Sequence, residues 1–198
     1  AMMPAIPTPT TRCLRAPTTK RFRQRICAIW KSWREKSLVT ELPVVNASPL
    51  IYLAHAGFID LLQVESETVL VPLVVRIEIG RRGPADPTVR ALQRSPWLLD
   101  AEAAPVPPQV SAWELGPGET AVIAWALAHQ CTAILDDLAA RRCAGGLGIP
   151  LIGTLGLVLK AKRKGLIRAA RPVLEKLRGS GMYLSDRILD PALRLVDE

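Results

Sequence analysis

The sequence predicts an α/β fold in which a short parallel sheet is flanked by helices. Short apolar segments typical of strands alternate with longer segments of helical spacing from residue 43 onward. Alternation of this kind indicates βαβ units, which place successive strands parallel. The composition agrees with this class, because 198 residues that are 49% hydrophobic and 22% charged suffice for one domain with a sizeable core.

The first half of this domain is expected to hold three strands. A strand over residues 43–46 leads into a helix with an apolar side made of Leu50, Ile51, Leu53, Ile59, Leu61 and Leu62. A second strand is expected over 69–71. Residues 73–79 have helical spacing, but their β-branched side chains leave a strand possible. A loop over 81–87, a short helix to about residue 94 and a strand near 97–100 follow.

The second half repeats the alternation. A Pro-rich connection over 103–108 precedes an Ala-rich helix that Gly116–Gly118 opens and that runs through His129. We then expect a buried strand over 132–135, a helix that starts within 136–143 and a short strand over 150–152. Helical segments over 154–164 and near 173–178 and 185–195 complete the domain, which spans residues 43–198.

Residues 1–42 are predicted to be a separate basic extension. The first 19 residues are rich in Pro and Thr without periodicity, which predicts disorder. Residues 20–36 have the pattern of a basic amphipathic helix, with the apolar residues Phe22, Ile26, Ile29, Trp30 and Trp33. Such a helix suits nucleic acid, an acidic membrane surface or a partner groove, and it equally suits packing on its own domain or no function at all.

The charges fall into blocks along the chain. Residues 1–38 carry nine basic and one acidic side chain, residues 39–140 five basic and twelve acidic, and residues 141–178 ten basic and one acidic. This asymmetry suggests an acidic site beside a surface that attracts polyanions. Solvated helix faces would give the same pattern, so both interpretations stay open.

Several classes of protein are excluded by missing motifs. No apolar run reaches the roughly 20 residues of a membrane span, and no secretory pattern begins the chain, so we expect no integral membrane association. Four cysteines without a Cys-x-x-Cys pair indicate reduced thiols in a cytoplasmic protein. No P-loop motif is present, so a P-loop NTPase is not expected. His55 and His129 stand alone on apolar helices, so a metal triad with histidine is not expected either.

Polar side chains stand where the predicted strands end or where the following helices begin. They are Asn46, Ser48, Glu78, Glu119, Asp136, Asp137 and Thr154. Function collects at the carboxyl ends of parallel strands. Glu78, between two isoleucines, and Asp136, after an apolar run, are expected to be partly buried. Oxygen ligands suit Mg²⁺ or Mn²⁺. The alternative is local, because Asn46, Ser48, Asp136 and Thr154 are all residue types that cap helices.

These segments resemble a known family. The chain contains, in the order of that family, the segments VVNASPLIYLA, VPLVVRIEIG, LGPGETAVIAWALA, AILDDLAARRCA and GIPLIGTLGLVLKAKRKGLI. They are similar to PIN domains, and more narrowly to the bacterial and archaeal subgroup with Gly-x-Gly-Glu and Leu-Asp-Asp motifs. The resemblance covers residues 43–180 and leaves residues 1–42 outside it.

The resemblance implies a Rossmann-like three-layer fold and a metal-dependent ribonuclease of the kind found among VapC-type toxins. Mg²⁺ or Mn²⁺ would be the cofactor and RNA the substrate, with an antitoxin protein and a second copy of the chain as further partners. The family's acidic positions fall on Asn46, Glu78, Glu119 and Asp137, or its neighbour Asp136. We expect the carboxylates of Glu78, Glu119 and Asp137 to lie close enough to share an ion.

Substrate-binding roles are implied for Ser48, Arg141, Arg142 and Thr154. A flanking track for the RNA backbone, or alternatively a solvated basic face, would consist of Lys160, Lys162, Arg163, Lys164, Arg168 and Arg171.

The departure from the family is Asn46, where the general pattern has Asp. An amide oxygen can ligate a metal but brings no charge, so a non-catalytic module that binds RNA or a protein is the alternative function. A membrane-surface role of residues 20–36 is a third hypothesis.

Overall fold

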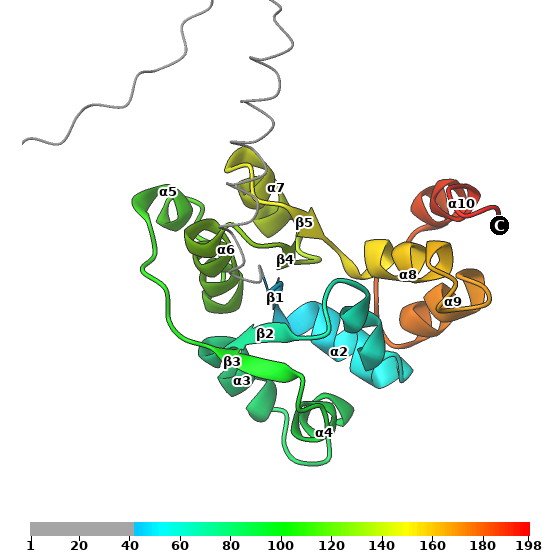
Figure 1. Ribbon diagram of the computed structural model, residues 1–198, viewed down its shortest axis with the longest axis horizontal. Coiled ribbons are helices and arrows are strands. Elements are labelled where there is room, and N and C mark those ends of the chain that lie inside the picture. The colour runs from blue at the N-terminus through cyan, green and yellow to red at the C-terminus, as the bar shows by residue number, and fades with distance from the viewer. Residues whose placement is uncertain (1–41) are drawn as a thin grey trace, which may run out of the picture. The chain divides into compact units, whose positions relative to one another are not determined.

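The computed structural model describes residues 42–198, and Figure 1 shows their arrangement. The predicted basic extension, with its helix over 20–36, therefore lies outside the described residues except for residue 42. Residues 42–198 belong to one compact unit.

A sheet of five parallel strands lies at the centre of this unit. The strands are β1 (Val44–Val45), β2 (Val69–Pro72), β3 (Leu98–Ala101), β4 (Ala133–Ile134) and β5 (Leu151–Ile152), in the spatial order β3-β2-β1-β4-β5. Val44 pairs with Leu70 on one side and with Ala133 on the other. The order reverses at β1, so the carboxyl ends of β1 and β4 border the crevice in which such sheets bind ligands. The predicted α/β class is confirmed.

Helices cover both faces of the sheet. They are α2 (Ala47–Ala56), α3 (Leu73–Gly80), α4 (Pro87–Arg94), α5 (Pro108–Ser111), α6 (Pro117–His129), α7 (Leu138–Gly146), α8 (Thr154–Arg163), α9 (Arg171–Gly179) and α10 (Asp186–Arg194). Helix α2 packs against α4, α8 and α9, whereas α6 packs against α3, α5 and α7. Figure 1 shows α2, α8 and α9 on one side of β1 and β4, and α5 and α6 on the other.

The central strands β1 and β4 are buried on both faces. Val44, Val45, Ala133 and Ile134 have no exposed surface. Strands of parallel sheets read as continuous apolar runs for this reason, which is how the sequence reveals them. The helix alternative for residues 73–79 is correct, since α3 begins at Leu73 directly after Pro72 ends β2.

Two local predictions were wrong. The helix expected to reach Leu62 ends at Ala56, because Gly57 adopts a left-handed backbone with φ of 77° and caps the helix through its N–H. A separate 3₁₀ segment, η1 (Ile59–Val64), follows and carries the remaining apolar residues. The second difference is the short helix α5, which forms after the Pro-rich connection, with proline at its first position. No helix among residues 42–198 is long and apolar enough to cross a membrane.

Candidate functional site

Asn46 follows β1 and is the central residue of the candidate site. It stands at the N-cap position of α2 but makes no capping hydrogen bond with its side chain. Its amide Nδ2 instead donates to Oε1 of Glu119, at 2.8 Å, across 73 residues of sequence. The residue is 1% exposed, and its Oδ1 is buried without a hydrogen-bond partner within the described structure. The capping interpretation of Asn46 is therefore wrong.

Glu78, which lies on α3, has its carboxylate close to the side chain of Asn46. A Cβ atom added at Gly118, in the first turn of α6, would lie 2.8 Å from Oδ1 of Asn46 and 3.2 Å from Oε2 of Glu78. Both oxygens thus face Gly118, and only glycine leaves the space between them open. We call Asn46, Glu78 and Glu119 the Asn46 cluster. It joins the end of β1, helix α3 and the start of α6.

Burial within the Asn46 cluster is uneven. Glu119 is half-buried, but Glu78 is exposed, so the expected burial of Glu78 was wrong. The reason is its neighbour Ile77, which is itself 51% exposed, while only Ile79 on the other side is buried. The cluster therefore has a buried end at Asn46 and an open end at Glu78.

The carboxylate of Asp136 binds the first residue of α8. Its two carboxylate oxygens accept the N–H of Thr154 at 2.8 Å and the hydroxyl of Thr154 at 2.5 Å. Burial raises the pKa of Asp136 above its ordinary value, against the hydrogen bonds from Thr154 and the charge of Arg141, which lower it. Thr154 is fully buried and does not cap α8, whose N-cap is Gly153. This pair ties the end of β4 to α8.

The carboxylate of Asp137 caps α7. It is the N-cap of that helix, and its Oδ1 accepts the N–H of Ala140 at 2.8 Å. The side chain is exposed. The capping role considered for Asp136 thus belongs to its neighbour.

The acids do not gather as the sequence suggested. Among residues 42–198, no three His, Cys, Asp or Glu side chains are grouped so that they could hold a metal ion. Glu78, Glu119 and Asp137 therefore form no such group in this structure, and Asp137 accepts an N–H of α7. The Asn46 cluster offers one amide oxygen and two carboxylates. This all-oxygen set, with a buried unpartnered oxygen, fits a hard divalent cation.

The predicted substrate-binding residues are spread around these acids. Ser48 is half-buried in the first turn of α2. Arg141 is half-buried on α7, and its guanidinium donates to the carbonyl of Leu135 at 3.3 Å and lies against Gly153. Arg142 is exposed on the same helix. Thr154 has its hydroxyl occupied by Asp136.

Part of the predicted basic track forms local contacts instead. Lys160 pairs with Glu65 at 2.8 Å, and Lys162 pairs with Glu198 at 3.2 Å. Lys164 donates to the carbonyl of Val64 at 2.7 Å. Two further members of the track, Arg163 and Arg168, are exposed.

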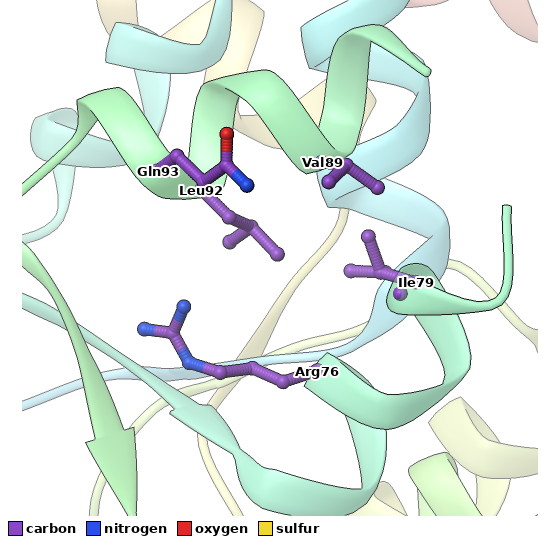
Figure 2. A pocket seen from close by; sticks show the side chains of 6 residues that line it. Arg76, Ile79, Val89, Leu92 and Gln93 are labelled. Atoms are coloured by element: carbon purple, nitrogen blue, oxygen red, sulfur yellow. The ribbon is translucent and has the colours of Figure 1, made fainter. Parts of the chain in front are cut away.

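Two residues near the site were missed from the sequence. Gly118 belongs to the Gly-x-Gly-Glu motif, so the motif itself was the available signal for a required glycine. Arg76 had no such signal. From α3, two residues before Glu78, it contacts Asp100 and donates to the carbonyl of Leu98, so it fastens α3 to β3. Figure 2 shows it pointing into a pocket of about 230 Å³ that α3 shares with α4.

Comparison with known proteins identifies the family. A family model described as a PIN domain (DUF3368) matches residues 42–198, which is all of the described structure. No curated protein matches the chain. The match agrees with the parallel sheet and with the motifs that led to the resemblance. The chain therefore belongs to the PIN-domain family.

Proposed function

We propose that this protein is a metal-dependent ribonuclease that holds Mg²⁺ or Mn²⁺ at the Asn46 cluster. PIN domains are typically metal-dependent nucleases, and the family match covers the whole described chain. One observation supports the placement of the ion above all others: the buried Oδ1 of Asn46, which has no partner in the described structure. A buried polar atom without a partner costs about 1–3 kcal/mol, and a bound cation would remove this cost.

The Asn46 cluster is prepared for a cation by its own contacts. The hydrogen bond from Nδ2 to Glu119 turns Oδ1 of Asn46 away from Glu119 and leaves it facing Gly118, beside Oε2 of Glu78. When bound, a divalent ion supplies Lewis acidity for phosphodiester hydrolysis. Because Asn46 is neutral, the cluster carries the charge of two carboxylates, which predicts weaker metal binding than three would give.

Asp136 and Asp137 act as positioning residues in this proposal. Asp136 fixes the first residue of α8 through Thr154. Asp137 fixes the first turn of α7, the helix that carries Arg141 and Arg142. We assign these arginines to the phosphates of RNA, because guanidinium groups form paired hydrogen bonds with phosphate oxygens.

Ser48 is assigned to the same substrate. It lies two residues after Asn46, in the first turn of α2, where its hydroxyl and the free N–H groups of the helix start favour an anion. A toxin role, with an antitoxin protein as partner, and a homodimer stay predictions from the family resemblance.

The second candidate is a PIN module that binds RNA without cleaving it. Two observations favour it, the neutral Asn46 and the lack of a three-acid group among the described residues.

Cleavage of RNA with added Mn²⁺ or Mg²⁺, compared with EDTA, separates the two candidates. We expect metal-dependent cleavage by the wild type and at least a hundredfold loss in Glu119→Gln, which removes a charge from the cluster. Glu175→Gln is the matched control, because Glu175 is exposed on α9 and lies outside the cluster. RNA binding without cleavage in either metal would favour the module.

A further inference from the structure

A basic pocket lies between α8 and the chain that follows α10. It is a pocket of about 600 Å³, a size within the about 300–1,000 Å³ of small-molecule sites. Its apolar wall includes Ile152, Leu159 and Leu195. Leu195 is 74% exposed, so the pocket presents apolar surface to solvent. Figure 1 shows α10 beside α8, the helix that follows β5.

Three cations of α8 line the same pocket. They are Lys160, Arg163 and Lys164, which one helix face presents because they lie three and four residues apart. Lys160 pairs with Glu65, whereas Lys164 donates to a backbone carbonyl and forms none of the ion pairs found among residues 42–198. Arg163 is exposed and forms none of the ion pairs found among the described residues. The pocket therefore carries uncompensated positive charge.

The other pockets of the described structure differ in charge. Asp100 and Glu102 line the apolar pocket of about 590 Å³ between α3, α6 and the loop after β3. In the pocket of Figure 2, the guanidinium of Arg76 is held by Asp100. A polyanion is attracted only where cations remain free, so the α8 pocket is the one of these three that suits it.

The α8 pocket reaches the start of α8, where Asp136 binds Thr154. Ile152 and Gly156, which both line it, stand two residues before and two residues after Thr154. Thr154 is the residue that binds both oxygens of Asp136.

We propose that the α8 pocket is a nucleotide subsite for single-stranded RNA. An unstacked base or sugar would lie against Leu159 and Leu195, and the adjoining phosphates would lie on Arg163 and Lys164. Single-stranded nucleic acid is bound by this combination of an apolar platform and cations along the backbone. The inference rests on the proposed function for the identity of its ligand.

The test is the affinity of a short fluorescein-labelled single-stranded RNA, measured by anisotropy in EDTA over a range of salt. Each phosphate contact to a single strand contributes about 0.7 to the slope of log affinity against log salt. Arg163→Ala should reduce that slope by about 0.7. With equal affinities of variant and wild type at 1 M salt, the variant then binds about fivefold more weakly than the wild type at about 0.1 M. Arg90→Ala is the matched control, because Arg90 is exposed on α4, whose helix leads into the opposite edge strand β3.

A second pair of variants tests the apolar wall. Leu195→Glu places a charge in the pocket at an exposed position, and it should weaken RNA binding more than Arg163→Ala does. Ile188→Glu makes the same change at a 50% exposed position of α10 that does not line the pocket, and it should leave affinity unchanged. Circular dichroism of each variant checks that the fold is kept.

The outcomes separate this inference from the proposed function. RNA cleavage in Mn²⁺ with unchanged affinity in Arg163→Ala and Leu195→Glu would overturn the subsite alone. Pocket-dependent binding without cleavage would support the subsite and overturn the nuclease. Binding of poly-L-glutamate, but not RNA, with the same dependence on Arg163 and Leu195 would assign the pocket to an acidic protein and overturn the inference. A wild type that binds no RNA would overturn it as well.

Discussion

The two sides of the crevice hold similar residues in opposite states. On the side of β1, α3 and α6, the Asn46 cluster keeps a buried oxygen without a partner. On the side of β4, α7 and β5, Asp136 has both oxygens occupied by Thr154, and Asp137 has one occupied by Ala140. Position at the same edge of a sheet therefore does not make an acid available to a ligand.

Side-chain length and place explain this difference. Asp137 directly precedes α7, and Asp136 ends β4 beside the start of α8, so each short carboxylate reaches a free backbone N–H group of a helix start. Glu78 lies inside α3, where the backbone N–H groups are already used, and Glu119 reaches across to the amide of Asn46. The acids on one side thus have backbone partners that stabilise the fold, and those on the other side do not bind helix starts.

The largest effect is expected from closing the Asn46 cluster. Gly118→Ala would place a Cβ 2.8 Å from Oδ1 of Asn46, against which the neighbours must move. We expect a loss of about 1–3 kcal/mol in the free energy of unfolding, as for overpacked cores, together with loss of Mn²⁺ binding. Chemical denaturation and calorimetric titration measure the two effects.

Gly145→Ala is the control for that substitution. Gly145 lies in α7 with nothing near its added Cβ, so alanine should stabilise the helix by about 0.5–1 kcal/mol. Normal Mn²⁺ binding in Gly118→Ala would show that the open space at Gly118 has no part in the site.

On the other side of the crevice, an effect on stability alone is expected, without one on metal binding. Thr154→Val removes the hydroxyl from Asp136 and leaves a half-buried carboxylate oxygen without its donor. We expect a cost of about 1–3 kcal/mol in stability with unchanged Mn²⁺ affinity, and Thr154→Ser should restore most of the stability. A fall in Mn²⁺ affinity at unchanged stability would place Asp136 in the metal site and break the comparison.

The smallest effect is expected at Asp137. Asp137→Ala removes the cap of α7 and should cost about 1 kcal/mol, whereas Asp137→Asn, which can still accept the N–H of Ala140, should cost little. Thermal unfolding of the two variants measures this difference. If Asp137→Asn instead abolishes metal binding and keeps full stability, Asp137 is a ligand, as the family resemblance implied.

The sequence predicted the fold better than it predicted the site. Strands such as Val44–Val45 and Ala133–Ile134 are buried apolar runs, which their own residues reveal. The partner of a polar side chain depends instead on distant chain segments. The sequence near Lys160 does not indicate its pairing with Glu65, which lies 95 residues away. The sequence near Asp136 likewise does not indicate its pairing with Thr154. The end of α2 at Gly57 was visible as a glycine, but the apolar residues beyond it continued the helical pattern.

The central claim is that the Asn46 cluster binds divalent metal, and Asn46→Asp tests it most directly. The substitution removes the donor to Glu119 and places two carboxylates together, so without metal the unfolding temperature should fall. With a third carboxylate, calorimetric titration should show tighter Mn²⁺ binding, where each tenfold gain equals about 1.4 kcal/mol. Unfolding at saturating Mn²⁺ should then recover the lost stability. An unchanged Mn²⁺ affinity, with an unfolding temperature that stays low in metal, would contradict the claim.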